Sequence, residues 1–265
     1  MSVPTASDWL ALVDAIAPFS LAEADDNVGL LIGDPAAQAQ RVLLALDVSP
    51  AVACEAVDGG YQLLITHHPV LHHGTRTLRW DDSALFPALT LLRGHVAHIA
   101  AHTNLDMADS GVSDTLAARL SLECIEKRGY LRVGTLPCMP LCDLLDHVQK
   151  RLGGWPRLFG KATQRVSRIA VCPGAGADEA ANARAARADV LITGDVRHHV
   201  ALEAGLPLID AGHWETERPI VDVLSQRLQA AANALNYSFN MDTSRHDASP
   251  LGASLGRIGG EATWI

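Results

Sequence analysis

Short apolar runs alternate with amphipathic segments along most of this chain, and the alternation predicts strands and helices in turn. The segment from Ser7 to Phe19 carries its apolar residues at helical spacing. Residues 41–47 and 62–66 are short apolar runs typical of buried strands, and residues 51–58 between them predict a helix. Strand, helix and strand in this order indicate a βαβ unit and therefore a parallel sheet.

A second unit of the same kind follows in the later part of the chain. Residues 167–172 and 189–193 are apolar runs, and the alanine-rich segment 178–188 between them predicts a helix. The stretches LLITHHP (63–69) and VLITGDV (190–196) both place Ile-Thr at the end of the second strand, before a polar turn. The similarity indicates two related lobes, although two unrelated βαβ units can share so short a pattern by chance.

We therefore expect an α/β protein of two related lobes with mostly parallel sheets. Residues 1–126 would form the first lobe and residues 127–265 the second, with a C-terminal tail that can pack back on the first lobe. Apolar residues make up 48% of the chain, which is ample material for a core in each lobe.

Candidate ligand side chains follow three of the predicted strands at the point where each strand ends. His67 and His68 follow the second strand of the first unit, Asp106 follows the next apolar run, and His213 follows the last one. Ligands of α/β proteins bind beyond the carboxyl ends of the strands. We therefore expect these side chains to converge on one binding site.

The residue types at these strand ends indicate divalent metal ions. Imidazole and carboxylate ligands without thiolate suit first-row ions of the Zn, Fe, Mn or Ni class. Two adjacent histidines on extended chain point to opposite sides, so His67 and His68 are placed to serve two ions. A carboxylate such as Glu217 can bridge two ions with its two oxygens, as a two-metal site with ions ~3.5–4 Å apart requires.

The spacing of His213 and Glu217 resembles the four-residue spacing of ligand pairs on a helix. Gly212 and Pro219 nevertheless predict that His213 lies in a loop and that Glu217 begins the last long helix. The sequence contains no HExxH motif, which disfavours a zinc protease of that kind.

Other polar residues near these motifs have weaker assignments. His102 precedes Asp106 by four residues and is a candidate general acid or base. The candidates for holding a substrate are Asp47, Thr103, Asn104 and His198. His72 and His73 follow a turn and are expected to be exposed, whereas His98 alternates into a strand and is expected in the core.

Charge and cysteine content narrow the possible partners and the compartment. The 21 basic and 30 acidic residues give a formal charge of −9, and no Lys/Arg stripe is present, so nucleic-acid binding is disfavoured. The five cysteines form no CxxC pair, which is typical of reduced thiols in a cytosolic protein. No apolar run approaches the ~20 residues of a membrane span, and the N-terminus does not resemble a signal peptide. We expect a cytoplasmic protein without a membrane partner.

Six stretches in this order resemble one family, the NIF-three-like dinuclear metal centre proteins, which are often called GTP cyclohydrolase 1 type 2 homologues. They reach from near the N-terminus to the start of the last long helix. The stretches are DNVGLLIG (26–33), LALDVS (44–49), LLITHHPVL (63–71), AHTNLD (101–106), VLITGDVRHH (190–199) and DAGHWETE (210–217).

The resemblance implies a dinuclear metal site, a ring-shaped hexamer and a possible nucleotide substrate. The family's metal ligands fall on His67, His68, Asp106, His213 and Glu217, with Glu217 as the bridge between two ions. The hexameric toroid would face its metal sites toward the central cavity. Longer members insert a domain between the lobes, and the stretch from Lys127 to Lys161 is too short to hold one.

Two functions remain open at this point. The first is a metal-dependent hydrolase that acts on a nucleotide such as GTP or on a related substrate. The second is a non-catalytic metal-binding, storage or scaffold protein that forms a ring. A pocket in which no Arg or Lys converges with the metal ligands would favour the second function.

Overall fold

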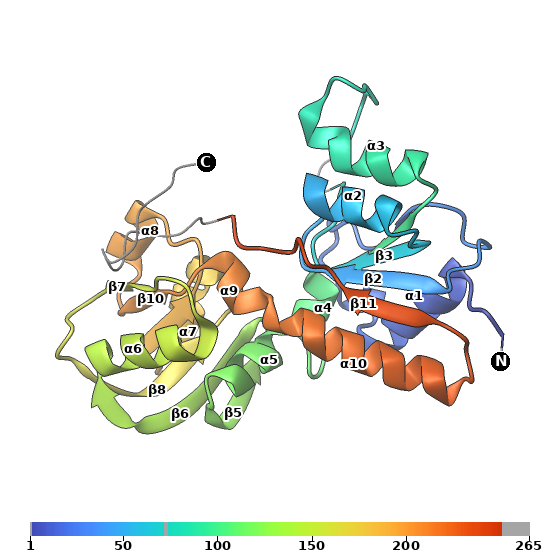
Figure 1. Cartoon of the computed structure of the whole chain (residues 1–265). Coiled ribbons are helices and arrows are strands. Elements are labelled where there is room, and N and C mark those ends of the chain that lie inside the picture. Colours follow the sequence, from blue (N-terminus) through green and yellow to red (C-terminus); the bar gives the residue numbers. More distant parts are fainter. Residues whose placement is uncertain (1, 72–73, 251–265) are drawn as a thin grey trace, which may run out of the picture.

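Two β-sheets, each with helices packed on both faces, divide the chain into two lobes that lie side by side (Figure 1). The computed structural model describes residues 2–71 and 74–250, so His72, His73 and the tail from residue 251 lie outside the described residues. The α/β fold class predicted from the sequence is confirmed. Within the described ranges, no helix is long and apolar enough to cross a bilayer.

The first lobe contains a five-stranded sheet with the strand order β1-β4-β3-β2-β11. The strands are β1 (Gly29–Ile32), β2 (Arg41–Ala45), β3 (Leu63–Thr66), β4 (Ala97–Ala100) and β11 (Asn240–Thr243). The helices are α1 (Ala6–Ile16), η1 (Phe19–Leu21), α2 (Pro50–Asp58), η2 (Ser83–Leu85), α3 (Phe86–Arg93), α4 (Thr103–Met107) and α10 (Pro219–Ala234).

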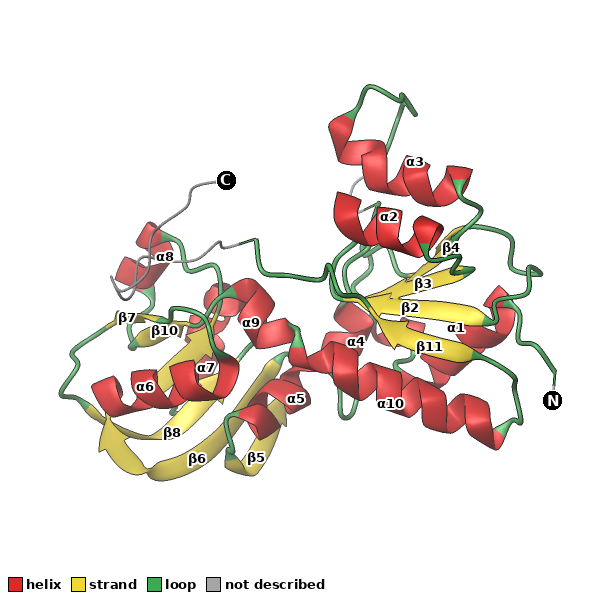
Figure 2. Ribbon diagram, viewed as in Figure 1, coloured by secondary structure: helices red, strands yellow, loops and turns green. Residues whose placement is uncertain are grey.

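The apolar runs of the first lobe become the buried middle of its sheet. β11, β2, β3 and β4 are parallel to one another, and β1 runs antiparallel to β4 at the edge. Helices α2 and α3 cover one face, while α1 and α10 cover the other (Figure 2). Covering both faces explains why the central strands are apolar at almost every position.

The second lobe contains a six-stranded sheet with the order β5-β6-β8-β9-β10-β7. The strands are β5 (Glu123–Arg128), β6 (Leu131–Pro140), β7 (Arg157–Phe159), β8 (Arg165–Val171), β9 (Val190–Thr193) and β10 (Leu208–Asp210). The helices are α5 (Val112–Arg119), α6 (Leu141–Leu152), η3 (Gly176–Glu179), α7 (Ala180–Ala185), α8 (His198–Glu203) and α9 (His213–Glu217).

The second sheet is mixed, which differs from the mostly parallel sheet expected. β8, β9 and β10 are parallel, whereas β5, β6 and β7 pair antiparallel with their neighbours. A tight turn at Gly129 joins β5 to β6, and a tight turn can join only antiparallel strands.

The chain also divides differently from the expected boundary after residue 126. That boundary falls inside β5, which pairs with β6 as part of the second sheet. After the second lobe the chain returns to the first: α10 packs Leu224 and Leu228 into the first core, and β11 pairs with β2. The return crosses between the lobes (Figure 1), so the two are joined by more than one connection.

Candidate metal centre

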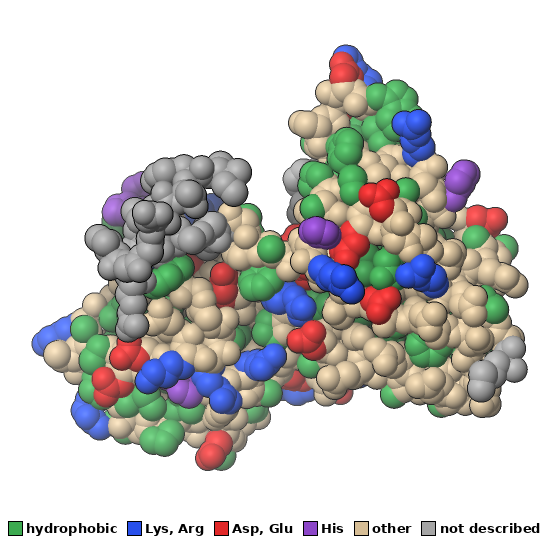
Figure 3. Space-filling model, in the orientation of Figure 1, with side chains coloured by type: hydrophobic (Ala, Val, Ile, Leu, Met, Phe, Trp, Pro, Cys, Tyr) green, Lys and Arg blue, Asp and Glu red, His purple; other side chains and the backbone are tan. Residues whose placement is uncertain are grey.

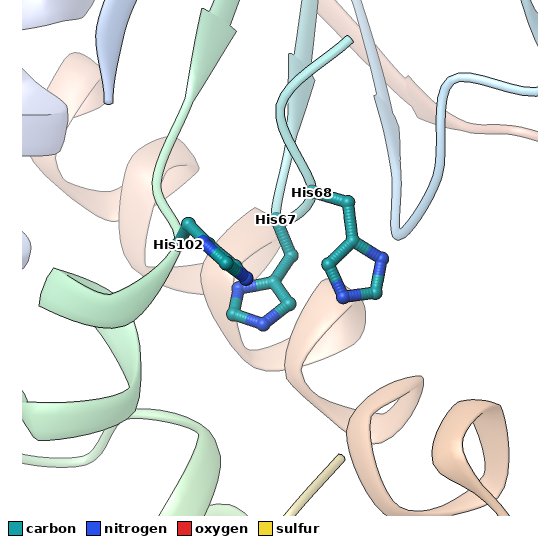
Figure 4. A group of neighbouring side chains, drawn as sticks. All are labelled: His67, His68 and His102. Atoms are coloured by element: carbon teal, nitrogen blue, oxygen red, sulfur yellow. The ribbon is translucent and has the colours of Figure 1, made fainter. Parts of the chain in front are cut away.

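The predicted ligands meet between the two lobes. His67 and His68 follow β3 and Asp106 lies on α4, all in the first lobe, whereas His213 and Glu217 lie on α9, which follows β10 of the second sheet. The candidate metal centre is therefore formed by strand ends of two sheets. The sequence had suggested one edge of a single sheet. Figure 4 shows His67, His68 and His102 reaching from the ends of β3 and β4 into the same space.

The first group of candidate ligands consists of His68, His213 and the Oε2 oxygen of Glu217. Glu217 Oε2 lies 3.1 Å from His68 Nε2 and 3.0 Å from His213 Nε2, and the two nitrogens are 3.4 Å apart. Neighbouring ligands on a tetrahedral ion with bonds of 2.0–2.1 Å stand about 3.3 Å apart. The spacing of these three atoms thus fits one shared metal ion.

A second group uses the other oxygen of the same carboxylate. His67 Nε2 lies 3.7 Å from Asp106 Oδ1 and 3.9 Å from Glu217 Oε1. His67, Asp106 and Glu217 form one possible metal-holding group, and His68, His213 and Glu217 form another. Glu217 belongs to both, with one oxygen turned toward each.

The pair on α9 is arranged differently from the prediction. His213 is not in a loop: it begins a five-residue helix that ends at Glu217. The two side chains therefore lie on one helix face, four residues apart. Gly212, with a φ of +92°, turns the chain into α9, and Pro219 begins the next helix. A helix this short leaves no periodic signal in the sequence.

Hydrogen bonds fix the orientation of each imidazole at the centre. The Nδ1 atoms of His68 and His213 each lie 2.7 Å from a carboxylate oxygen, of Asp47 and Asp195 respectively. His67 Nδ1 lies 2.8 Å from the carbonyl of Ala101. Such contacts hold the Nδ1 proton and leave Nε2 available to bind a metal ion.

Burial and charge perturb the ionisation of the ligands. Burial lowers the pKa of His67 to about 3 and raises the pKa of Asp106 well above its usual value. Burial alone would also lower the pKa of His68, but the carboxylates of Asp47 and Glu217 outweigh it and raise the pKa to about 10. The pKa of His213 rises to about 9 against the same burial penalty, through Glu217 and Asp195.

The pKa shift of Glu217 shows that its buried carboxylate depends on neighbouring groups to stay charged. Burial would raise the pKa of Glu217, but the close imidazoles of His213 and His68 lower it, so the carboxylate depends on nearby positive charge. Glu217 is 4% exposed. Buried ions require a partner of opposite charge, and metal ions meet that requirement.

Three buried ligand atoms also lack a hydrogen-bond partner among the described residues. They are His67 Nε2, Asp106 Oδ1 and Glu217 Oε2. Buried polar atoms are almost always satisfied, so three that converge on one space indicate a missing partner. The donor set and the spacing both fit divalent metal ions.

The other predicted residues are not all brought to this centre. His102 lines the cavity, and its Nδ1 lies 2.9 Å from Asp26 Oδ1. The Thr103 hydroxyl donates a hydrogen bond to Asp26. Asn104 is fully buried, and its side-chain amide donates to the carbonyl of Ala17. The prediction that His198 faces the pocket is not supported, because it begins the surface helix α8 and lines a separate cavity.

His98 lies in the core, as expected. Its side chain is fully buried in β4, and its Nε2 is 2.7 Å from Thr66 Oγ1. The Thr66 hydroxyl in turn donates to the carbonyl of His68 at 2.6 Å. His98 therefore supports the turn that carries the two adjacent histidines.

The cavity at the centre also includes residues that sequence reasoning missed. It has a volume of about 780 Å³, and its lining includes Glu23, Tyr130, Asp178, Glu179 and Asp195. No Lys or Arg lines it within the described ranges. Asp195 lies two residues beyond the end of β9, so the strand-end argument could have found it; Glu23 and Tyr130 follow no such pattern.

The fold and geometry define a class: a two-lobed α/β protein whose His and carboxylate side chains form a candidate metal site between the lobes. The chain belongs to the Duf34/NIF3 (NGG1p interacting factor 3) family, whose model matches residues 4–250. This confirms the resemblance drawn from the six motifs.

Individual relatives match over nearly the full chain. A Streptomyces coelicolor protein named GTP cyclohydrolase 1 type 2 homolog is 32% identical, over 96% of this chain and 95% of its own length. A Staphylococcus aureus hypothetical protein of known structure is 27% identical with a TM-score of 0.87, over 94% of this chain and 99% of its own. A Bacillus cereus protein related to NIF3 has a TM-score of 0.90 at 21% identity, over 96% of this chain and 100% of its own, and shows the fold alone.

Proposed function

We propose that this protein is a metal-dependent hydrolase whose centre holds two divalent ions. The position of Glu217 carries the proposal, because its two oxygens face two separate ligand groups. His68 and His213 would hold one ion and His67 and Asp106 the other, with Glu217 bridging. The ions would be of the Zn, Fe, Mn or Ni class, since the donors are imidazole and carboxylate.

The side chains around the ligands have roles that follow from their contacts. When bound, two divalent ions lower the pKa of water toward ~7 and stabilise developing negative charge. Asp47 and Asp195 keep two of the imidazoles in the orientation that binding requires. His102 lines the cavity, and Asp26 holds its Nδ1, so His102 is the residue placed to move a proton to or from a substrate.

The substrate is less well indicated than the reaction class. The names of several relatives suggest GTP, in which attack at the imidazole C8 would open the ring. Proteins that bind triphosphates usually supply Lys or Arg to the phosphates. The described lining offers neither, which argues against a triphosphate substrate.

The same observation favours a second candidate, a non-catalytic metal-binding, storage or scaffold protein. A cavity without Lys or Arg was the feature expected of that alternative. The hydrolase nevertheless accounts for more of the site, because a storage site needs neither a cavity of about 780 Å³ nor the His102–Asp26 pair beside the ligands.

We further propose that the protein is cytoplasmic, forms a homohexameric ring and does not bind nucleic acid. Acidic and basic side chains are interspersed on the face shown in Figure 3.

Metal analysis and substrate turnover together test the proposal. The full chain is purified, its metal is measured by elemental analysis, and GTP, other nucleotides, phosphoesters and amides are supplied as substrates. Glu217→Ala should lose metal and turnover together, whereas Asp146→Asn on the exposed side of α6 should keep both. Turnover that survives removal of the metal would contradict the hydrolase proposal, and bound metal without turnover would favour the second candidate.

A further inference from the structure

We infer that the substrate of this centre carries a positive charge, such as a primary ammonium group, beside the bond that is hydrolysed. The inference deepens the proposed hydrolase function and rests on it. Its basis is the charge of the cavity wall, where seven carboxylates lie. They are Glu23, Asp47, Asp106, Asp178, Glu179, Asp195 and Glu217.

Four of these carboxylates are already used by the metal site. Asp106 and Glu217 are proposed ligands, and Asp47 and Asp195 hold the imidazoles of His68 and His213. Two divalent ions bring four positive charges, and these four carboxylates offset them. The centre itself would then be close to neutral.

Three further carboxylates remain on the wall and give it a net negative charge. Glu23, from the first lobe, accepts a hydrogen bond from the Tyr130 hydroxyl at 2.9 Å. Glu179 accepts one from the Asn182 amide at 2.8 Å. Neither partner is a cation, so the hydrogen bonds orient these two carboxylates without neutralising them. Asp178 lies beside Glu179 on η3, on the second-lobe side of the cavity.

Asp178 has the one cationic contact recorded for these three wall carboxylates within the described ranges. Arg197 lies 3.3 Å from Asp178, with the two side chains 74% and 76% exposed. An exposed ion pair of this kind is weak and is screened by salt. Arg197 does not line the cavity.

The buried ligand atoms show that this acidic wall surrounds a binding site and is not merely a solvated surface. Asp106 Oδ1 is buried and has no hydrogen-bond partner among the described residues, and Asp106 lines the same cavity. A substrate held at the ligand atoms would therefore share the cavity with Glu23, Asp178 and Glu179. Opposite charges attract and like charges repel, so this negative wall favours an ammonium group and disfavours a phosphate.

In this substrate class, water adds to the acyl carbon of an aminoacyl amide or ester. The carbon–nitrogen or carbon–oxygen bond breaks, and the leaving group takes up a proton. The free α-amine remains protonated throughout and serves only for recognition by the wall.

A matched pair of probes tests the charge preference without requiring turnover. Leucine hydroxamate and N-acetyl-leucine hydroxamate share a metal-binding group and differ in the ammonium charge. Their binding to the zinc-loaded full chain is measured by calorimetry, with inorganic phosphate and GTP as anionic probes. The proteins compared are the unmodified chain, the triple variant Glu23→Gln, Asp178→Asn, Glu179→Gln, the single variant Arg197→Ala and the control Asp146→Asn.

We expect leucine hydroxamate to bind roughly tenfold or more tightly than its acetylated form. The triple variant should lose most of this preference, and Asp146→Asn should keep it. Equal binding of the two hydroxamates, no binding of either, or tighter binding of phosphate or GTP that Arg197→Ala abolishes would overturn the inference. A clear preference for the ammonium probe, with no turnover of any substrate in the panel, would uphold the charge preference and favour the non-catalytic candidate over the hydrolase.

Discussion

Glu217 Oε2 lies 3.1 Å from His68 Nε2, so a carboxylate on α9 of the second lobe meets an imidazole at the end of β3 in the first. The contact joins residues 149 positions apart in the sequence and defines the space between the lobes. Because both groups are candidate ligands, a metal ion here would also link the two lobes.

The carboxylates behind the imidazoles should control metal affinity without touching the metal. Asp195→Asn would remove the negative charge that orients His213 and raises its basicity. Changes of this kind usually weaken metal binding by about 10- to 100-fold. Competition with a chelator of known affinity measures the loss, and Asp146→Asn serves as the control. Unchanged affinity in Asp195→Asn would show that the contact has no such role.

Metal binding should release protons. The pKa values of His68 and His213, about 10 and about 9, lie above neutral pH, so both imidazoles are protonated at pH 7 in the metal-free protein. A metal ion binds only the unprotonated nitrogen. The metal affinity should therefore increase as the pH is raised to about 9 to 10 and should level off above that range. Calorimetry at pH 7 in buffers of different ionisation enthalpy would detect the released protons. A binding heat that does not depend on the buffer would contradict this expectation.

Gly174 should be required for the bridging position of Glu217. A Cβ atom at this position would lie 2.1 Å from Glu217 Oε1, and the φ of +61° adds a strain of roughly 1–2 kcal/mol for other residues. Gly174→Ala should therefore lower metal affinity as well as the melting temperature. Gly74→Ala is the matched control, because a Cβ there meets nothing within 4 Å. If both variants bound metal equally well, the close approach would have no functional weight.

The buried Arg132 should make the fold sensitive to acid through Asp114. Arg132 is 1% exposed and pairs with Asp114. Burial alone would raise the pKa of Asp114, but hydrogen bonds from Arg132 and Lys127 outweigh it and lower the pKa. A carboxyl with a lowered pKa stabilises the fold above about pH 4, and this stabilisation is lost as the pH falls through the folded-state pKa.

Asp114→Asn tests this pair in the absence of metal. The variant leaves the Arg132 guanidinium buried without its counterion, and we expect a loss of about 3 kcal/mol in the free energy of unfolding at pH 7. Urea unfolding of chelator-treated protein would show that loss shrinking toward pH 3. A difference that is the same at both pH values would mean that the ion pair does not set the acid stability.

The strand-end argument could predict much of the site because it depends on local sequence. Apolar runs end where polar ligands begin, and parallel strands present their ends on the same side. The argument could not show that His213 and Glu217 lie on one helix, since α9 is too short to display a period. The sequence also suggested His198 as a pocket residue. In the structure His198 begins α8, which lies on the surface, and it lines a separate cavity.

The division into lobes was harder to predict for a different reason. The apolar face of α10 looks the same whichever core it enters, and β11 is mostly exposed with no apolar run. Only the packing shows that both return to the first sheet. The acidic wall likewise combines Glu23 with Asp178, which are far apart in the sequence.

The most direct test of the metal centre is a crystal structure of the metal-loaded protein with anomalous scattering. Two peaks ~3.5–4 Å apart are expected, one beside His68 and His213 and the other beside His67 and Asp106. Each oxygen of Glu217 should contact one ion. A single peak, or peaks away from Glu217, would contradict the account of a dinuclear centre.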